Sequence, residues 1–313
     1  MMSESPKSGQ PHGHSQPIYS ILALKDSTSA QGIVSASTDG IMCIWAPDLL
    51  AKPQESVRLA LNNASYRTDE VSVSCLGVEN GNVTRFWIGT EEGSVLLVNR
   101  YDSASSKAGV QQHVTYRAHT GPVTSMHFHP GAFKGSSGRF DVDVQKASAK
   151  SVEVDRSSAD SRNHDEAHVP DLEGFFLTAS FDWTICLWKS RISPERHRPL
   201  SLASPNTDPT DATHPDRTII EPLLTLSAEH DAVYDVRWHP VYCSMFAAVD
   251  GSGKLSIWDL AQSQDMPVFV EHILQDVALT KVRWDANGTH IMVGDEAGFV
   301  GCYQIGHVSV SFR

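Results

Sequence analysis

The sequence lacks the features that mark membrane-spanning, secreted and nucleic-acid-binding proteins. No apolar run approaches the roughly 18 residues needed to cross a bilayer, and Met1 to Pro17 is polar, so we expect no membrane insertion and no secretory signal. Acidic residues outnumber basic ones, which gives a formal net charge of −12. This charge argues against nucleic acid as the main partner.

Cysteine is also scarce, and the five that occur are scattered through strand-like runs. An odd, dispersed set predicts buried free thiols in a reducing compartment, so we expect a cytoplasmic protein. These residues are Cys43, Cys75, Cys186, Cys243 and Cys302.

Long helical patterns are missing as well, and short strands with alternating apolar residues take their place. Residues 177–188 predict a β-hairpin, because apolar positions alternate on both sides of a tight turn. The turn recurs in one register along the chain, with small residues before it and usually an aromatic residue five positions after it. The turn residues are Gly40, Gly93, Trp183, Gly253 and Gly298.

Each hairpin is preceded by another strand, which begins at Ile18, Val73, Val123, Val233 or Leu279. Repeated units of three to four strands predict an all-β fold, a WD-repeat β-propeller with about five blades visible. We assign the propeller to residues 13–305, with polar tails at 1–12 and 306–313.

The spacing of the repeats is uneven because of two insertions. Residues 131–172 are rich in Ser, Asp, Lys and Gly, and residues 191–221 carry five prolines. Neither segment has enough apolar side chains to offset the entropy of ordering, so we expect two long disordered loops between strands.

Two sets of polar residues invite a catalytic interpretation. His119, Thr178, Asp182 and Trp188 occur in the same order as His14, Ser35, Asp39 and Trp45. A hydrolase could use a histidine, a hydroxyl and an aspartate, with His119 and Asp182 as its central pair. The set occurs twice, however, and ends each time in a tryptophan that can only donate. We therefore predict structural tetrads, buried hydrogen-bond networks that tie strands together.

No cofactor or metal site is expected. The i, i+2 pairs His12/His14 and His127/His129 could begin a zinc site, but no third ligand lies nearby in the sequence. No phosphate-binding glycine loop is present either.

Several strings resemble a particular family, the intermediate chains of cytoplasmic dynein. The most specific are residues 89–95 (GTEEGSV) and residues 180–184 (SFDWT), together with residues 37–45, 233–238 and 249–253. The resemblance covers about residues 10–305 apart from the two insertions. Members of this family carry about seven blades, so the chain is expected to be a C-terminal propeller portion.

The resemblance implies a non-catalytic scaffold of a microtubule motor, located in the cytoplasm on the cytoskeleton. Its propeller would bind the dynein heavy chain and support cargo attachment, while light chains and dynactin would bind a region upstream. Because microtubules are acidic, the negative net charge argues against direct contact with the track. A generic WD-repeat adaptor, such as a ubiquitin-ligase substrate receptor or a trafficking scaffold, remains the alternative.

Positions that face a partner can be chosen only by propeller geometry. The second residue of an inner strand and the residue before the turn aspartate should reach one face of the propeller, where exposed aromatic side chains would make hot spots. These positions are Tyr19, Thr38, Thr124, Phe181 and Tyr234.

Overall fold

The computed structural model describes residues 13–25, 31–59, 71–79, 84–100, 110–131, 174–190, 198–199, 218–227 and 231–305. All helix or strand elements in these ranges are strands. The same ranges hold no helix that could span a membrane. The predicted tails 1–12 and 306–313, and nearly all of the insertion 131–172, lie outside the described residues.

The strands form five sheets, and apart from two strands that extend the second sheet, the strands of each sheet follow chain order. The first sheet contains β1 (Ile18–Lys25), β2 (Gln31–Ser37), β3 (Ile41–Trp45) and β4 (Glu55–Arg58). The second contains β5 (Val73–Gly77), β6 (Arg85–Thr90), β7 (Ser94–Asn99) and β8 (Val110–Arg117), extended by β13 (Thr218–Ile220) and β12 (Arg198–Pro199). The third contains β9 (Val123–Phe128), β10 (Phe175–Ser180), β11 (Ile185–Lys189) and β14 (Leu224–Leu226).

The fourth sheet contains β15 (Val233–Trp238), β16 (Met245–Asp250), β17 (Lys254–Asp259) and β18 (Phe269–His272). The fifth contains β19 (Leu279–Trp284), β20 (His290–Asp295) and β21 (Val300–Gln304). Sheets of four antiparallel strands are the blades of a propeller. The predicted fold class is therefore confirmed.

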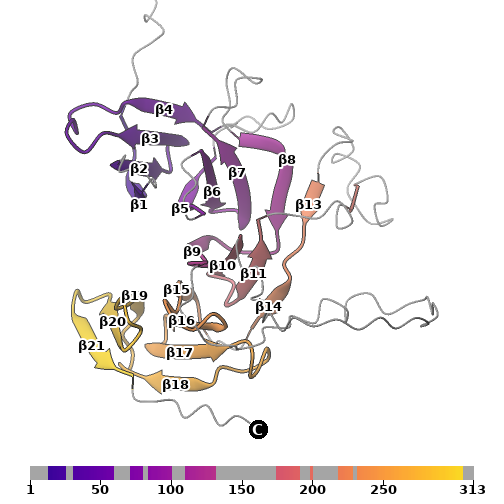
Figure 1. Cartoon of the computed structure of the whole chain (residues 1–313), viewed down its shortest axis with the longest axis vertical. Helices are drawn as coiled ribbons and strands as arrows, with labels where there is room; N and C mark the ends of the chain where they lie inside the picture. Colours follow the sequence, from indigo (N-terminus) through magenta and orange to yellow (C-terminus); the bar gives the residue numbers. More distant parts are fainter. Residues whose placement is uncertain are drawn as a thin grey trace, which may run out of the picture.

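The five sheets follow one another along an arc (Figure 1). Their first strands, which are β1, β5, β9, β15 and β19, contact one another in that order. These inner strands begin where the sequence predicted them, because each starts an alternation of apolar and polar residues.

The core is divided among the four interfaces between neighbouring sheets. Leu76 and Phe86 pack toward the first sheet, whereas Cys75 and Trp87 pack toward the third. Two further clusters fill the third-to-fourth and fourth-to-fifth interfaces. Alternate residues of one strand therefore serve different interfaces, and β16 in the fourth sheet is buried at every position.

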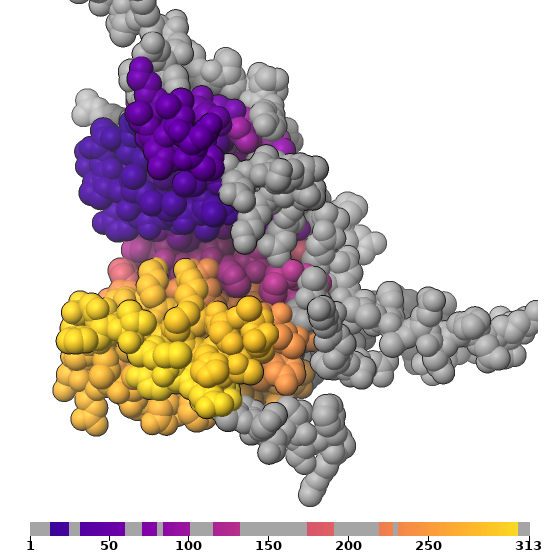
Figure 2. All heavy atoms as spheres, turned by 60° about the vertical axis from the view of Figure 1, so that its left-hand side comes forward, coloured from indigo at the N-terminus to yellow at the C-terminus, as the bar shows by residue number. Residues whose placement is uncertain are grey.

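The first and fifth sheets each have a neighbour on one side only. Strand β20 alternates between exposed and buried residues, and Ile18 and Ile21 of β1 are exposed. In Figure 2 the first sheet (indigo) and the fifth (yellow) lie on the same side of the molecule, separated by a band from the middle of the chain. Apolar side chains on both terminal sheets are thus left uncovered.

The shared turn register is visible in the backbone. Trp183 and the four glycines at the equivalent turn positions all have positive φ, between 68° and 90°. Glycine reaches this region without steric cost, whereas a tryptophan does so at a cost of about 1–2 kcal/mol. Trp183 is therefore the strained member of the repeat.

Two expectations need correction. The insertion 191–221 is not a loop throughout, because β13 pairs in parallel with β8 and Ile220 is buried against the second and third sheets. The expectation that the thiols are buried is correct only in part. Cys43, Cys75 and Cys186 are buried, but Cys302 is exposed. Its strand, β21, lies at the uncovered end of the arc.

Candidate functional site

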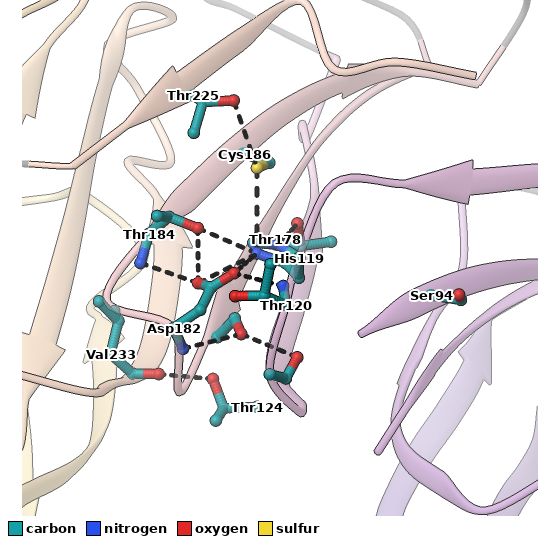
Figure 3. Close-up of polar contacts among 12 residues, drawn as sticks. Ser94, His119, Thr120, Thr124, Thr178, Asp182, Thr184, Cys186, Thr225 and Val233 are labelled. Carbon is teal, nitrogen blue, oxygen red and sulfur yellow. Dashed lines mark hydrogen bonds and ion pairs between the residues drawn. The ribbon is translucent and has the colours of Figure 1, made fainter. Parts of the chain in front are cut away.

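A chain of polar side chains crosses the third sheet from its core to its turn (Figure 3). The indole Nε1 of Trp188 donates to the Oγ1 of Thr178 at 2.8 Å, and the same oxygen lies 2.7 Å from Nε2 of His119. On the other side of the ring, Nδ1 lies 3.2 Å from a carboxylate oxygen of Asp182. The four residues predicted as a set are thus in contact.

Asp182 also organises the turn itself. Its carboxylate accepts from the backbone N–H of Thr120 at 2.8 Å and of Thr184 at 3.1 Å, and from the Thr184 hydroxyl at 2.6 Å. One carboxylate therefore fixes both the β10–β11 turn and the segment that leads into β9. Such charge-assisted bonds are stronger than neutral ones.

The pair formed by His119 and Asp182 shifts the protonation of both groups. Burial disfavours a charged His119, but its hydrogen bond to Asp182, then its contact with Cys186 and the charge of Asp182, outweigh burial and raise the pKa of His119 to about 9. Burial likewise disfavours a charged Asp182, but the bonds from His119, Thr184 and Thr120 hold its pKa well below its usual range. At neutral pH the ring is then a cation that donates to both Asp182 and Thr178.

The first sheet carries the second copy of this arrangement. Trp45 Nε1 donates to Ser35 Oγ at 2.7 Å, and His14 Nε2 lies 2.7 Å from the same oxygen. His14 Nδ1 lies 3.4 Å from Asp39, whose carboxylate also accepts from the backbone N–H of Ile41. The two copies differ mainly in burial, because His14 and Trp45 are half-buried whereas His119 and Trp188 are buried.

Burial decides what these sets can do chemically. Thr178 is 0% exposed and Trp188 only 1%. A hydroxyl that no substrate can touch cannot act as a nucleophile, so the hydrolase hypothesis has no support in this geometry. The contacts instead match a buried polar network that joins strands.

Replacing Asp182 with alanine should lower the free energy of unfolding by roughly 1–3 kcal/mol, because it removes the negative charge beside His119 and leaves the backbone N–H groups of Thr120 and Thr184 unpaired. A pKa raised in the folded state makes the His119 contribution complete below its usual value of 6.5, and that contribution is lost as pH rises through about 9. The lowered Asp182 pKa removes stability as pH falls below about 3.8. Chemical denaturation at several pH values measures the difference in the free energy of unfolding between the parent chain and Asp182→Ala.

This gap in the free energy of unfolding between the parent chain and Asp182→Ala should be widest between about pH 4 and 6.5 and should narrow toward pH 9. Asp265→Ala, at an exposed turn, is the matched control and should change stability by less than about 0.5 kcal/mol. A gap that is absent, or that widens above pH 7, would contradict a structural role for the pair of His119 and Asp182.

Two histidines in His-Pro turns make contacts that the sequence did not suggest. Nε2 of His129 in the third sheet lies 3.0 Å from the Cys243 carbonyl in the fourth, and Nε2 of His239 lies 3.1 Å from the Gly288 carbonyl in the fifth. Each Nδ1 accepts from a backbone N–H of its own turn. Mainly through burial, the pKa of His129 falls to about 4, so the ring stays neutral and links two blades.

The other members of the histidine pairs provide no metal site within the described residues. His127 accepts from the backbone N–H of Trp238 at 3.0 Å, and no group of three potential ligands gathers in the described ranges. His12 lies outside them.

The predicted partner-facing residues are only partly brought together. Phe181 and Tyr234 pack edge to face with ring centres 5.2 Å apart, and Phe181 is 43% exposed. The Thr124 hydroxyl donates to the Val233 carbonyl at 2.6 Å, so it joins two blades. Tyr19 is exposed but lies on β1 in the first sheet, and Thr38 is half-buried there.

Trp183 is a surface aromatic residue that the sequence analysis used only as a turn marker. It is 52% exposed and lies two residues from Phe181. A tryptophan at the turn position where the four other repeats have glycine is the sequence signal that could have singled it out. We call Phe181, Trp183 and Tyr234 the aromatic face.

Blades of antiparallel strands, joined by a Trp–hydroxyl–His–Asp chain, are the arrangement of a WD-repeat type of propeller. In agreement, the family model "WD domain, G-beta repeat" matches residues 7–46. The chain is similar to the cytoplasmic dynein 1 intermediate chain of Drosophila melanogaster, with 26% identity over 292 residues. This confirms the resemblance seen in the sequence. The similarity covers 93% of this chain and 33% of that relative, so the chain spans about a third of the relative's length.

Proposed function

We propose that the chain is a non-catalytic WD-repeat scaffold subunit of a cytoplasmic dynein complex, acting at microtubules. The observation that carries this proposal is the similarity to a dynein intermediate chain along nearly the whole chain. The burial of the two hydroxyls, those of Thr178 and Ser35, supports a structural role for the residues that could otherwise suggest catalysis.

We propose further that the propeller binds the dynein heavy chain, and that the aromatic face contributes to this contact. Phe181, Trp183 and Tyr234 come from two neighbouring blades, the third and the fourth. Large aromatic side chains are frequent hot spots because they bury much area with little loss of conformational entropy. The retained strain at Trp183 is consistent with selection for its side chain rather than for stability.

Replacing Trp183 with glycine separates binding from folding. The change relieves a positive φ at a non-glycine residue but adds freedom to the unfolded chain, so stability should change by no more than about 1 kcal/mol. Binding should weaken by about 2–4 kcal/mol, as for a central aromatic hot spot. Co-purification with the heavy chain from cells, followed by titration of the purified partners, measures this effect.

Met266→Ala serves as the control, since Met266 is an exposed apolar residue on a turn of the fourth sheet. It should leave heavy-chain binding unchanged. Heavy chain recovered equally with Trp183→Gly would remove the aromatic face from the contact. Recovery of ubiquitin-ligase or coat subunits in place of any heavy chain would overturn the motor assignment and favour a generic adaptor.

A further inference from the structure

A cluster of positive charge lies at the inner strands of the fourth and fifth sheets in this acidic protein. Its centre is Asp235 on β15, which is 0% exposed. Arg237 Nη2 lies 3.1 Å and Arg283 Nη1 2.9 Å from its carboxylate. Because Asp235 also accepts from Ser125 in the third sheet, the carboxylate joins three blades.

The inner strands share an irregularity that places these side chains together. In β15 and β19 the pairing with the next strand shifts register just before Asp235 and Lys281, as it does before Ser20 and Cys75 in the first two sheets. A β-bulge re-aims the side chains that follow it. Lys281 and Arg283 are two residues apart on β19, so they share one face of the strand.

The cluster holds more positive charge than Asp235 can neutralise. Arg237, Lys281 and Arg283 oppose a single carboxylate, which leaves two positive charges uncompensated within the cluster. The neighbouring His127 responds to this field: burial, then repulsion from Arg237, lowers its pKa to about 3. The ring is thus neutral and adds no charge.

Donors in the cluster remain available to a ligand. Arg283 uses only Nη1 internally, toward Asp235 and the Val282 carbonyl, and its side chain is 52% exposed. Among the described residues, no acceptor bonds Arg283 Nε or Nη2 or Lys281 Nζ. Asp235 holds the Arg283 guanidinium in place, so its free edge is oriented before a ligand arrives.

We propose that Lys281 and Arg283 form a binding site for a phosphate-class oxyanion, steadied by the pair of Asp235 and Arg237. A guanidinium edge offers two parallel donors that match two oxygens of a tetrahedral oxyanion, and an ammonium adds a third. A dianion balances the two uncompensated charges, whereas a carboxylate leaves one unbalanced. The ligand is either free phosphate or a phosphoryl group carried by a protein.

The test is isothermal titration calorimetry of the full chain with inorganic phosphate at pH 8 and constant ionic strength. We expect saturable binding to one site, weakened at least tenfold by Lys281→Gln and by Arg283→Gln. Lys52→Gln and Arg117→Gln, which remove exposed cations elsewhere, should bind like the parent chain. Acetate should bind several-fold more weakly than phosphate.

A peptide with one phosphoserine and otherwise neutral residues separates the two sources. Tighter binding than inorganic phosphate, with the same loss in both site variants, would assign the site to phosphoproteins, and equal affinity would assign it to free phosphate. Each variant is first checked for an unchanged melting temperature. The proposal is wrong if both site variants bind phosphate like the parent, if the control variants lose equally, or if acetate binds as well as phosphate.

Discussion

Replacing Asp235 with asparagine is expected to lower the free energy of unfolding by about 3–5 kcal/mol, the cost of breaking a buried ion pair from one side. The substitution keeps the size of the side chain but removes the negative charge that faces Arg237, whose side chain is only 16% exposed. Attraction from Arg237, and then from Lys281 and Arg283, overcomes burial and lowers the pKa of Asp235, so the carboxylate is charged at neutral pH.

Asp235→Asn loses contacts in three sheets at once, since Ser125, Arg237 and Arg283 all meet this carboxylate. A domain of this size is commonly stable by only about 5–15 kcal/mol, so the loss is a large share of the total. Denaturant unfolding followed by circular dichroism gives the difference. Asp48→Asn, at an exposed turn, is the control and should shift stability by less than about 0.5 kcal/mol.

The double variant Asp235→Leu/Arg237→Met tests the mechanism. Removing both charges together often restores stability, because no charge is then left buried without a partner. The double variant should therefore be more stable than Asp235→Asn. A loss below about 1 kcal/mol in Asp235→Asn, or a double variant that is less stable still, would contradict the role given to this ion pair.

The second large effect is expected at the turn between β16 and β17. Gly253 has φ of +83°, and a Cβ added there would meet the carbonyl oxygen of Leu274 and lie 2.9 Å from that of Val277. The segment after β18 also donates to the Gly253 carbonyl, from Ile273 N–H at 3.0 Å. Backbone atoms held in this way cannot shift to make room.

Gly253→Ala should therefore lower the free energy of unfolding by about 2–4 kcal/mol, combining the cost of positive φ with overpacking. Gly298 is its matched control: it has the same kind of turn and φ of +90°, but nothing lies within 4 Å of an added Cβ. Gly298→Ala should cost only about 1–2 kcal/mol. Thermal and denaturant unfolding of both variants measures the difference, and equal losses would show that the contact with Leu274 does not matter.

These two glycines and Trp183 show how one sequence register carries different constraints. All three have positive φ at equivalent turns. At Gly253 a neighbouring segment closes over the turn, at Gly298 the turn is open, and at Trp183 a large exposed side chain occupies it. The register was predictable from the spacing of residues, but the neighbours of each turn were not.

The fourth sheet shows a similar limit for the tetrads. It has the closing Trp258 but no serine or threonine at the position of Thr178, where Ala248 stands. Trp258 Nε1 instead donates to the Ser256 hydroxyl at 3.3 Å, and this hydroxyl lies 3.4 Å from the Ala248 carbonyl. These contacts take the place of a tetrad in the fourth sheet. They depend on how β16 and β17 pair, so the sequence alone did not reveal them.

The sequence by itself determined the all-strand fold, the five inner strands, the turn register and the membership of both tetrads. These features follow from local alternation and from fixed spacings within one blade, which strand geometry converts directly into position. Only the tertiary structure decided the partners of Asp235, which come from residues 110 and 48 positions away. It also decided the pairing of β13 with β8 and the meeting of Phe181 with Tyr234. Those contacts join different blades, and their distances depend on how whole sheets pack, which no pattern within a single repeat specifies.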